Sequence, residues 1–152
     1  MQDFPQTLQK LKQTGNAQDL VGLIPYAQTL GVEIQTQEEN RLLFVLPANH
    51  DVVGNPTLPA IHGGALSGFM EVSSALYLLF CSQRLIIPRV VDFSIDFLRA
   101  GRIVDTFASC EVMRQGARVA NIQITAWQDD ASQPIATARA NFLTEPLELP
   151  SS

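Results

Sequence analysis

The chain has 152 residues, of which 46% are hydrophobic and 16% charged, and its formal net charge is −5. This composition excludes a disordered chain, and the length predicts one domain with a core of its own. The ten Lys and Arg do not cluster, so the chain lacks the basic surface that nucleic acid requires. Two cysteines, Cys81 and Cys110, make no disulfide framework and are expected to be reduced core thiols. No basic segment followed by an apolar one opens the chain, so we expect a cytoplasmic location.

The first sixty residues predict two helices, two strands and a loop. A weak helical pattern opens the chain, and a stronger one is followed by Gly31, a residue type that commonly ends helices. Two strand patterns then flank a short polar turn, and a stretch rich in Pro, Gly and Asn follows. The expected elements are a peripheral helix within residues 1–15, a helix over 20–30, strands over 32–37 and 41–46, and a loop over 48–59.

Paired glycines, Gly63 and Gly64, open a run that is apolar on nearly every face and predicts a helix to about Cys81. This run has interrupting polar side chains and falls short of the ~20 residues that cross a bilayer, so we expect a buried core helix and no membrane contact. Its one charged residue is Glu71. A single carboxylate in an apolar helix is costly, which indicates either a structural partner or a function.

Beyond the helix the pattern predicts only strands. Residues 91–97 alternate between apolar and polar side chains, and further strands are expected over 103–113, 120–126 and 135–143. Tight turns join them, so successive strands should be antiparallel neighbours. Their apolar face needs a cover, which the long helix supplies. The predicted fold is α+β, with a long central helix wrapped by a curved antiparallel β-sheet and an N-terminal helical segment.

Glu71 and the glycine pair are the main candidates for catalysis. The N–H groups of Gly63 and Gly64, at the positive end of a helix, suit a carbonyl that becomes an oxyanion. Glu71 suits a general base or a nucleophile, and a paired structural carboxylate is the alternative. Gly63 and Glu71 should stand about 12 Å apart along one helix, so one small reacting group cannot touch both in one subunit. A dimer that brings the Glu71 of one subunit to the glycines of the other resolves this.

Several other polar residues are candidates for binding or positioning. His62 can fix the loop or help to hold a carbonyl, and Asn55 can orient water or a thioester oxygen; a capping His and a turn Asn are the ordinary alternatives. Two His without suitably spaced Cys or acids predict no metal site, and the common nucleophile and nucleotide motifs are absent from the sequence. Four arginines flank the expected sheet turns and are candidates to meet phosphates, with solvated turn residues as the ordinary alternative: Arg99, Arg102, Arg114 and Arg118.

The segment His62-Gly63-Gly64, with an acid nine residues after the His, resembles the hotdog-fold acyl-CoA thioesterases of the PaaI-like, phenylacetate-pathway type. Residues 91–101, which read VDFSIDFLRAG, are similar to that family's strand after the central helix. The two segments stand in the family's order and spacing, and the resemblance covers about residues 20–145. It implies a single hotdog domain over 1–152, in which residues 1–18 are peripheral and about 20–145 form the core.

The resemblance further implies hydrolysis of an acyl-CoA thioester to a carboxylate and coenzyme A, without a metal or redox cofactor. It implies a dimer that pairs through a continuous sheet, often pairing again into a tetramer, with active sites between subunits and coenzyme A along the surface. Carried over, the Gly63 or Gly64 N–H polarises the carbonyl, and the partner's Glu71 activates water or attacks directly. Asn55 stands one residue before the family's loop Asn, whose position Pro56 occupies here.

Three alternatives stay open. The closest is a non-catalytic acyl-CoA binding or sensing protein on the same fold, in which Glu71 only holds its position. A hotdog hydratase needs an Asp–His pair, for which His50 and His62 are poorly placed, and a structural protein fits a buried acid beside a glycine pair least well. The residues expected to face the cleft, and so to favour a medium-length or aromatic acyl group, are Leu66, Phe69 and Met70.

Overall fold

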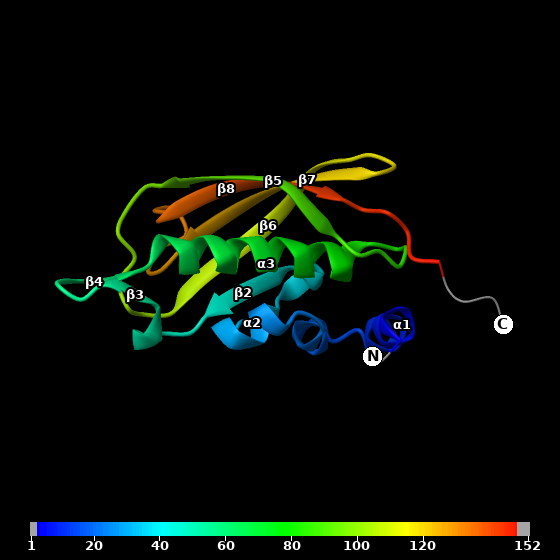
Figure 1. The fold of residues 1–152 in the computed structure, drawn as a ribbon, viewed down its shortest axis with the longest axis horizontal. Coiled ribbons are helices and arrows are strands. Elements are labelled where there is room, and N and C mark those ends of the chain that lie inside the picture. The colour runs from blue at the N-terminus through cyan, green and yellow to red at the C-terminus, as the bar shows by residue number, and fades with distance from the viewer. Residues whose placement is uncertain (1–2, 149–152) are drawn as a thin grey trace.

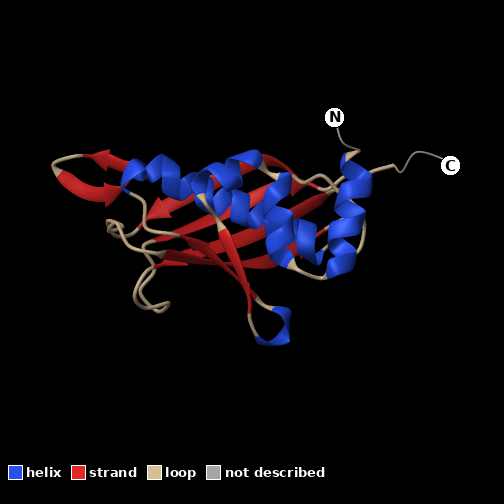
Figure 2. Ribbon diagram, turned by 90° about the horizontal axis from the view of Figure 1, so that it is seen from below, coloured by secondary structure: helices blue, strands red, loops and turns tan. Residues whose placement is uncertain are grey.

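The computed structural model describes residues 3–148 as two layers, a six-stranded antiparallel sheet and a group of helices against one face of it (Figure 1 and Figure 2). This is the predicted hotdog arrangement. The expected ends of the domain, residues 1–2 and 149–152, lie outside the described residues. The elements in chain order are α1 Phe4–Thr14, the 3₁₀ helix η1 Ala17–Leu23, α2 Pro25–Leu30, β1 Glu33–Thr36, η2 Glu38–Asn40, β2 Leu42–Leu46, η3 His50–Val52, β3 Val53–Asn55, β4 Leu58–Ile61, α3 Gly63–Cys81, β5 Arg89–Phe97, β6 Thr106–Gln115, β7 Val119–Trp127 and β8 Ala136–Leu143.

The helix expected over 20–30 is in fact two short helices, η1 and α2. Pro25 is the first residue of α2, where its missing N–H and fixed φ suit the start of a helix. The same properties prevent η1 from continuing into α2 as one helix. Gly31 ends α2 with a φ of 73°, in the left-handed region, as predicted. The sequence pattern recognised the apolar face shared by both pieces and missed the break between them.

The N-terminal helix α1 is packed against the rest of the fold. Leu8 is completely buried in the core. The Nζ of Lys12 donates hydrogen bonds to the carbonyl oxygen of Leu79, at 2.6 Å, and to that of Ser82. These carbonyls belong to the C-terminal turn of α3, where a cation also interacts favourably with the helix dipole. The ammonium is partly desolvated there, and this burial lowers the pKa of Lys12.

The strands are ordered β1-β2-β6-β7-β8-β5, and every neighbouring pair is antiparallel. The expected pairing of β6 with β7 and of β7 with β8 is confirmed. The expected pairing of the strand over 91–97 with the next one is wrong, because β5 pairs with β8 at the edge of the sheet. The segment between β5 and β6 is too long for a tight turn, and Arg102 in it instead forms a bridge with Ala60.

Residues 48–59 are more ordered than the predicted loop. They contain η3 and most of the β3–β4 hairpin, which projects beyond the N-terminal end of α3 (Figure 1). Two backbone hydrogen bonds hold the base of the hairpin. Ile61 N donates to Gly101 O, in the β5–β6 connection, at 2.9 Å, and His62 N, just before α3, donates to Val52 O at 2.7 Å. The local composition indicated turns, but the register of so short a hairpin depends on these tertiary contacts.

Helix α3 runs from Gly63 to Cys81 as predicted and packs against the concave face of the sheet. By length and composition it meets the criteria for a membrane span, yet most of that window is buried inside the protein, as in any core helix. It is not buried all round. A stripe from its first turn to past its middle stays open, with one or two residues per turn at least partly exposed: Gly64, Ser67, Gly68, Glu71 and Ala75.

The two cysteines occupy different environments, and only one matches the predicted core thiol. Cys81, the last residue of α3, is exposed, so its expected place in the core is wrong. Cys110 lies on β6 and is partly buried, and burial raises the pKa of its thiol well above the usual range. Both thiols are free.

Candidate functional site

The N-terminal end of α3 is held by His62, the residue before the first helical position. Its Nδ1 accepts a hydrogen bond from the Gly64 N–H at 2.8 Å, so the imidazole caps the helix. A Cβ on Gly64 would stand 2.9 Å from this Nδ1, and glycine is therefore needed for the cap to close. Within residues 3–148 the Gly63 N–H has no protein partner, which leaves this donor available at the positive end of the helix.

Gly63 lies at the bottom of a shallow pocket of about 440 Å³ between the start of α3 and the end of β5. The ring of Phe97 covers it, and a Cβ on Gly63 would meet the Phe97 Cζ at 3.1 Å. The pocket also contains Arg99, whose guanidinium donates to Gln133 Oε1 at 3.2 Å. An exposed N–H donor, an aromatic ring and a cation thus border one pocket.

Glu71 lies on the open stripe of α3, where its side chain is partly exposed. Its backbone carbonyl accepts a hydrogen bond from the Ser74 hydroxyl at 2.6 Å. In the part of the chain that the structure describes, its carboxylate has no ion-pair or hydrogen-bond partner. A structural role for Glu71 would require a partner within the subunit that holds the carboxylate, and the described residues provide none.

Gly63 and Glu71 belong to one uninterrupted helix, which puts them about 12 Å apart along its axis. A carbonyl that accepts a hydrogen bond from Gly63 is out of reach of the carboxylate of the same subunit. The protomer holds each half of the candidate site but does not bring the two halves together.

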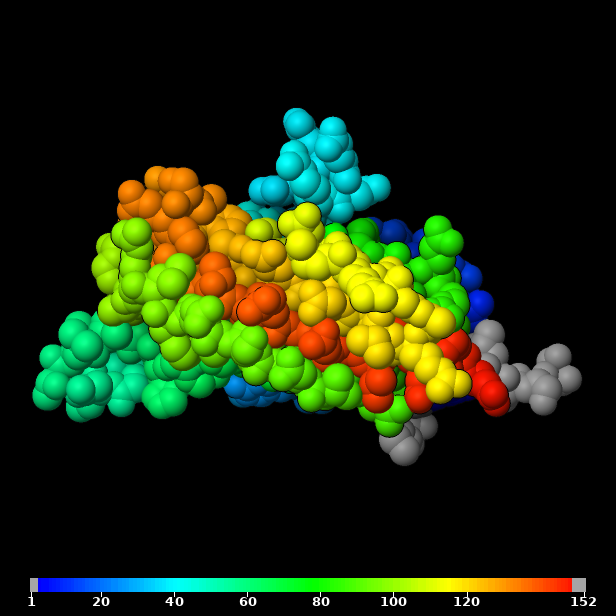
Figure 3. Space-filling view, turned by 90° about the horizontal axis from the view of Figure 1, so that it is seen from above, coloured from blue at the N-terminus to red at the C-terminus, as the bar shows by residue number. Residues whose placement is uncertain are grey.

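The edge strand β5 has an exposed apolar surface next to this site. Among residues 3–148 it pairs with β8 alone, and no strand of this part of the chain pairs with its other side. Figure 3, which looks onto the outer face of the sheet, shows β5 along one edge and the β1–β2 hairpin at the opposite one. A long apolar edge of this kind favours pairing with another strand. The exposed apolar residues on or next to it are Val90, Val91, Phe97 and Leu98.

The four candidate arginines do not form one cluster. Arg99 borders the Gly63 pocket, and Arg102 forms an exposed ion pair with Asp129. Arg114 and Arg118 flank the β6–β7 turn and together line a separate cavity of about 760 Å³. Strand pairing puts that turn at the Arg89 end of β5, opposite to the end where Phe97 covers Gly63.

Asn55 lies at the tip of the β3–β4 hairpin, and its side chain is occupied in the turn. The Oδ1 accepts hydrogen bonds from the Thr57 N–H at 2.9 Å and from the Thr57 hydroxyl at 2.7 Å. It does not line the pocket at Gly63. In this protomer Asn55 stabilises a turn, which is the ordinary role for Asn at such a position.

Two of the three residues expected to face the cleft, Phe69 and Met70, do not face it. Phe69 and Met70 are fully buried in the core, and Leu66 is buried and only borders the pocket beside Gly63. The side chains that flank the open stripe of α3 are instead Phe97 and Tyr26, which sequence reasoning missed. The only signal for them is indirect: Gly63 and Gly68 in the helix leave room that a neighbouring ring can fill.

Two further features bear on the choice of site. Among the described residues, no three His, Cys, Asp or Glu side chains gather in a way that could hold a metal ion. A larger cavity, of about 780 Å³, lies between the β1–β2 hairpin and strands β6 and β7, and its lining includes Tyr77 and Trp127. It contains none of the predicted site residues. Tyr77 comes from the C-terminal half of α3, whereas Gly63 and Glu71 lie in its N-terminal half.

The chain is similar in sequence to a known protein family and to one of its characterised relatives. A model of the thioesterase superfamily matches residues 58–135, which include the helix start, Glu71 and the strands that follow. The chain is 25% identical over 133 residues to the medium/long-chain acyl-CoA thioesterase YigI of Salmonella typhimurium, covering 79% of this chain and 85% of that protein.

Solved structures agree with the fold over nearly the whole chain. A protein of Chromobacterium violaceum is 40% identical and superimposes with a TM-score of 0.76, covering 94% of this chain and 99% of that one. A Bacillus halodurans protein solved with CoA has a TM-score of 0.72 at 17% identity, covering 82% and 81% of the two chains. At that identity the likeness is one of fold.

Proposed function

The chain belongs to the thioesterase superfamily and is a thioester hydrolase, and on that premise we propose that it hydrolyses acyl-CoA thioesters at sites shared between two subunits. The observation that carries the proposal is the carboxylate of Glu71 on an open helix stripe, about 12 Å along the same helix from the N–H donor of Gly63, both without a partner among residues 3–148. The similarity to an acyl-CoA thioesterase, and a fold shared with a protein solved with CoA, support an acyl-CoA as the substrate.

The proposed reaction uses each group for one task. The carboxylate of Glu71 accepts a proton from a water molecule, whose oxygen adds to the thioester carbon. The carbonyl oxygen becomes an oxyanion and accepts a hydrogen bond from the Gly63 N–H of the other subunit, aided by the positive helix end. When the tetrahedral intermediate collapses, the C–S bond breaks, and the coenzyme A thiolate receives the proton held by Glu71. The Gly64 N–H, already bonded to His62, maintains the helix start.

The partner in this proposal is a second copy that pairs its β5 with the β5 of the first. Phe97 is level with Gly63, and the midpoint between Gly63 and Glu71 lies about 6 Å further along α3. Two residues of β5 span about the same length, so a two-fold axis near Ile95 would bring the Gly63 of one subunit to the Glu71 of the other. The proposed assembly is accordingly a homodimer or a pair of such dimers. The proposed location is the cytoplasm.

Side-chain pairing supports the same register. With the axis at Ile95, Ser94 faces Asp96 across the interface, and Phe93 faces Phe97, so the exposed ring of Phe97 becomes buried against another aromatic ring. An axis at Ser94 would put Asp92 opposite Asp96, and an axis at Asp96 would oppose that residue to itself. Both alternatives bring like charges together and are disfavoured.

This register makes a prediction for disulfide cross-linking. In a background with the exposed Cys81 replaced by serine, the double variant Ser94→Cys/Asp96→Cys is expected to form a disulfide-linked dimer on mild oxidation, because its two cysteines face each other across the axis. Each single variant is the matched control and should stay uncross-linked. Non-reducing electrophoresis measures the outcome. A dimer cross-linked by Ser94→Cys alone, or a protein that sediments as an active monomer, contradicts the proposed interface.

The same pairing bears on where coenzyme A lies. Antiparallel pairing of β5 brings the Arg89 end of one sheet alongside the Phe97 end of the other, and the β6–β7 turn lies at the Arg89 end. The partner's Arg114 and the partner's Arg118 are therefore the proposed contacts for the phosphates of coenzyme A, with Arg99 beside the thioester. Arg102 is already paired with Asp129 and is left out.

Release of free thiol from a panel of acyl-CoAs tests the proposed activity. We expect release from at least one of acetyl-, octanoyl-, palmitoyl- and phenylacetyl-CoA, with kcat/KM above about 10⁴ M⁻¹s⁻¹ for the best of them. The alternative, a non-catalytic acyl-CoA sensor, predicts calorimetric binding of the same compounds without thiol release. That second result would overturn the catalytic proposal and leave Glu71 without the role assigned to it.

A further inference from the structure

The contact between Tyr26 and Gly68 links the N-terminal helices to the open stripe of α3. Tyr26 belongs to α2, and its ring packs directly on the backbone of α3. A Cβ on Gly68 would stand 2.8 Å from the Cε1 of Tyr26 and 3.0 Å from its Cζ, closer than any real side chain allows. Gly68 has no left-handed backbone conformation, so its glycine serves this close approach. A glycine inside a helix costs about 1 kcal/mol relative to Ala, which indicates that the contact has a purpose.

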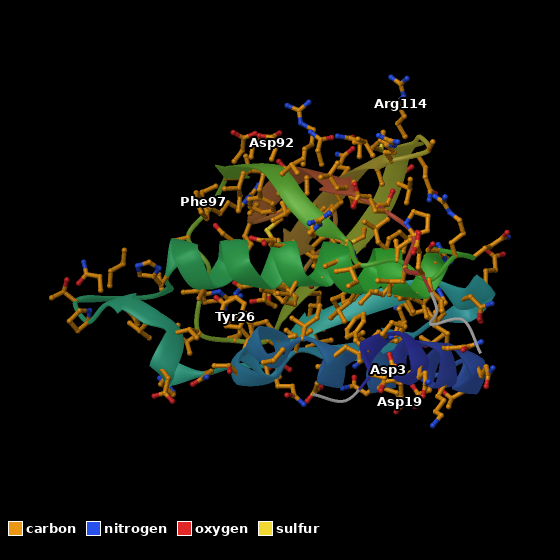
Figure 4. The ribbon with its side chains drawn as sticks, turned by 45° about the vertical axis from the view of Figure 1, so that its right-hand side comes forward. Asp3, Asp19, Tyr26, Asp92, Phe97 and Arg114 are labelled. Carbon is orange, nitrogen blue, oxygen red and sulfur yellow. The ribbon has the colours of Figure 1, made fainter. Side chains whose placement is uncertain are left out.

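Tyr26 stands beside the residues of the proposed site. Gly68 comes four residues after Gly64 and three before Glu71, so it is one helical turn from each and lies on the same face. The side chain is 47% exposed, and its hydroxyl has no hydrogen-bond partner among residues 3–148. Figure 4 shows Tyr26 on one side of the N-terminal half of α3 and Phe97 on the other. The two rings therefore lie on either side of the open stripe.

The charges near Tyr26 indicate which part of a substrate meets its ring. Helix α2 contains no acidic or basic residue, so nothing on it can hold a phosphate. The nearest candidate cation, Arg99, lies on the Phe97 side. Tyr26 and the rest of α2 are uncharged, which suits an apolar acyl group and not the nucleotide end of coenzyme A.

We propose that Tyr26 is a specificity-determining residue, whose ring forms one wall of the acyl subsite beside Glu71. The inference rests on the proposed function. The ring meets α3 about 5 Å along the axis from Glu71, so it contacts the carbons that follow the thioester carbonyl. Acyl groups of four or more carbons reach the ring, and an acetyl group does not. The wall comes from residues ahead of the region that the family model matches, so it is a feature of this chain's N-terminal segment.

Steady-state kinetics of two Tyr26 variants tests this. Tyr26→Ala is expected to lower kcat/KM for octanoyl-CoA about 10-fold, mainly through KM, because an apolar contact is worth about 1–3 kcal/mol in a specificity pocket. Acetyl-CoA, at whatever rate it reacts, should change by less than about threefold. Tyr26→Phe keeps the ring and should behave as the wild type with both substrates, since the hydroxyl has no partner.

Gly68→Ala provides a second, independent change to the same contact. Its Cβ displaces the ring, so it should lower the melting temperature and reproduce the loss with octanoyl-CoA. Adding Tyr26→Ala should restore much of the melting temperature, which shows that the two residues act on one contact. The proposal is overturned if Tyr26→Ala, folded and active, handles octanoyl- and acetyl-CoA as the wild type does. Absence of thiol release by the wild type itself is a different result and overturns the proposed function instead.

Discussion

Glu71→Gln is expected to lower kcat for acyl-CoA hydrolysis by about 10³-fold or more, because the amide keeps the size of the side chain but cannot accept a proton from water. Folding should be unaffected. The carboxylate has no partner among the described residues whose loss would cost stability, and the residue is only partly buried. Thiol release under saturating substrate measures the loss, and thermal unfolding and sedimentation serve as controls.

Measuring substrate binding distinguishes a loss of catalysis in Glu71→Gln from a loss of substrate binding. The variant should still bind the acyl-CoA that the wild type turns over, and calorimetry can compare this binding with that of the product, coenzyme A. A variant with wild-type turnover would contradict the catalytic role of Glu71. A single turnover in ¹⁸O-labelled water then bears on the form of that role. Label in Glu71 identifies attack by the carboxylate, through an acyl anhydride that water hydrolyses at the Glu71 carbonyl, because general-base catalysis puts the label only in the product acid.

Gly63→Pro is the second substitution with a large expected effect, a fall in kcat of about 10² to 10³-fold. Proline removes the backbone N–H that would bind the oxyanion, and one donor of this kind is worth that much in other acyl transfers. The position tolerates proline, because it is the first residue of α3 and His62 before it has an extended backbone, with φ −59° and ψ 133°. The Gly64 N–H and its cap from His62 remain in place.

Gly63→Ala is the matched control for this variant. It adds the same Cβ, which meets the ring of Phe97 at 3.1 Å, but keeps the N–H. We expect a modest loss of stability in both variants, measured by thermal unfolding, and a large loss of kcat in the proline variant alone. Equal kcat values for the two variants would show that crowding against Phe97, and not the N–H, accounts for any change.

Mixing the two inactive variants tests the shared site directly. In a dimer of one Glu71→Gln subunit and one Gly63→Pro subunit, one site combines an intact Glu71 with an intact Gly63, and the other site lacks both. Hybrid dimers isolated with two different affinity tags should therefore recover about half of the wild-type activity. A site built within one subunit predicts no recovery at all.

The central helix, its lone carboxylate and the β5 alternation could be read from the sequence because each depends on local order. The run from Gly63 to Cys81 is long and apolar, and Phe93, Ile95 and Phe97 alternate with acids and a serine as a half-buried strand requires. The glycine pair also favours the observed start of the helix, since Gly64 leaves room for the His62 ring that caps it.

Other features could not be read in this way because they depend on which segments meet. The pairing of β5 with β8 instead of β6 follows from the route of residues between β5 and β6 around the end of α3. The hairpin at residues 53–61 is too short to form without the contacts to Gly101 and Val52. Residues expected in the cleft, such as Phe69, turned to the core because a helix that is apolar on every face gives no periodic signal for its orientation.

The sequence by itself determined the central helix, the strands of the main sheet, the class of fold and the two groups that the proposed chemistry needs, since these rest on residue type and on regular spacing. Only the tertiary structure decided which N–H stays free, which face of α3 stays open, and that Tyr26 and Phe97 flank it. The open face and its flanking rings arise from contacts between residues far apart in the chain, and side-chain periodicity carries no information about such contacts. The free N–H depends on the local orientation of the His62 ring, which residue type alone does not give. The separation of Gly63 from Glu71 follows from sequence and structure together. The spacing in the sequence predicts it, and the continuous helix keeps the two residues apart.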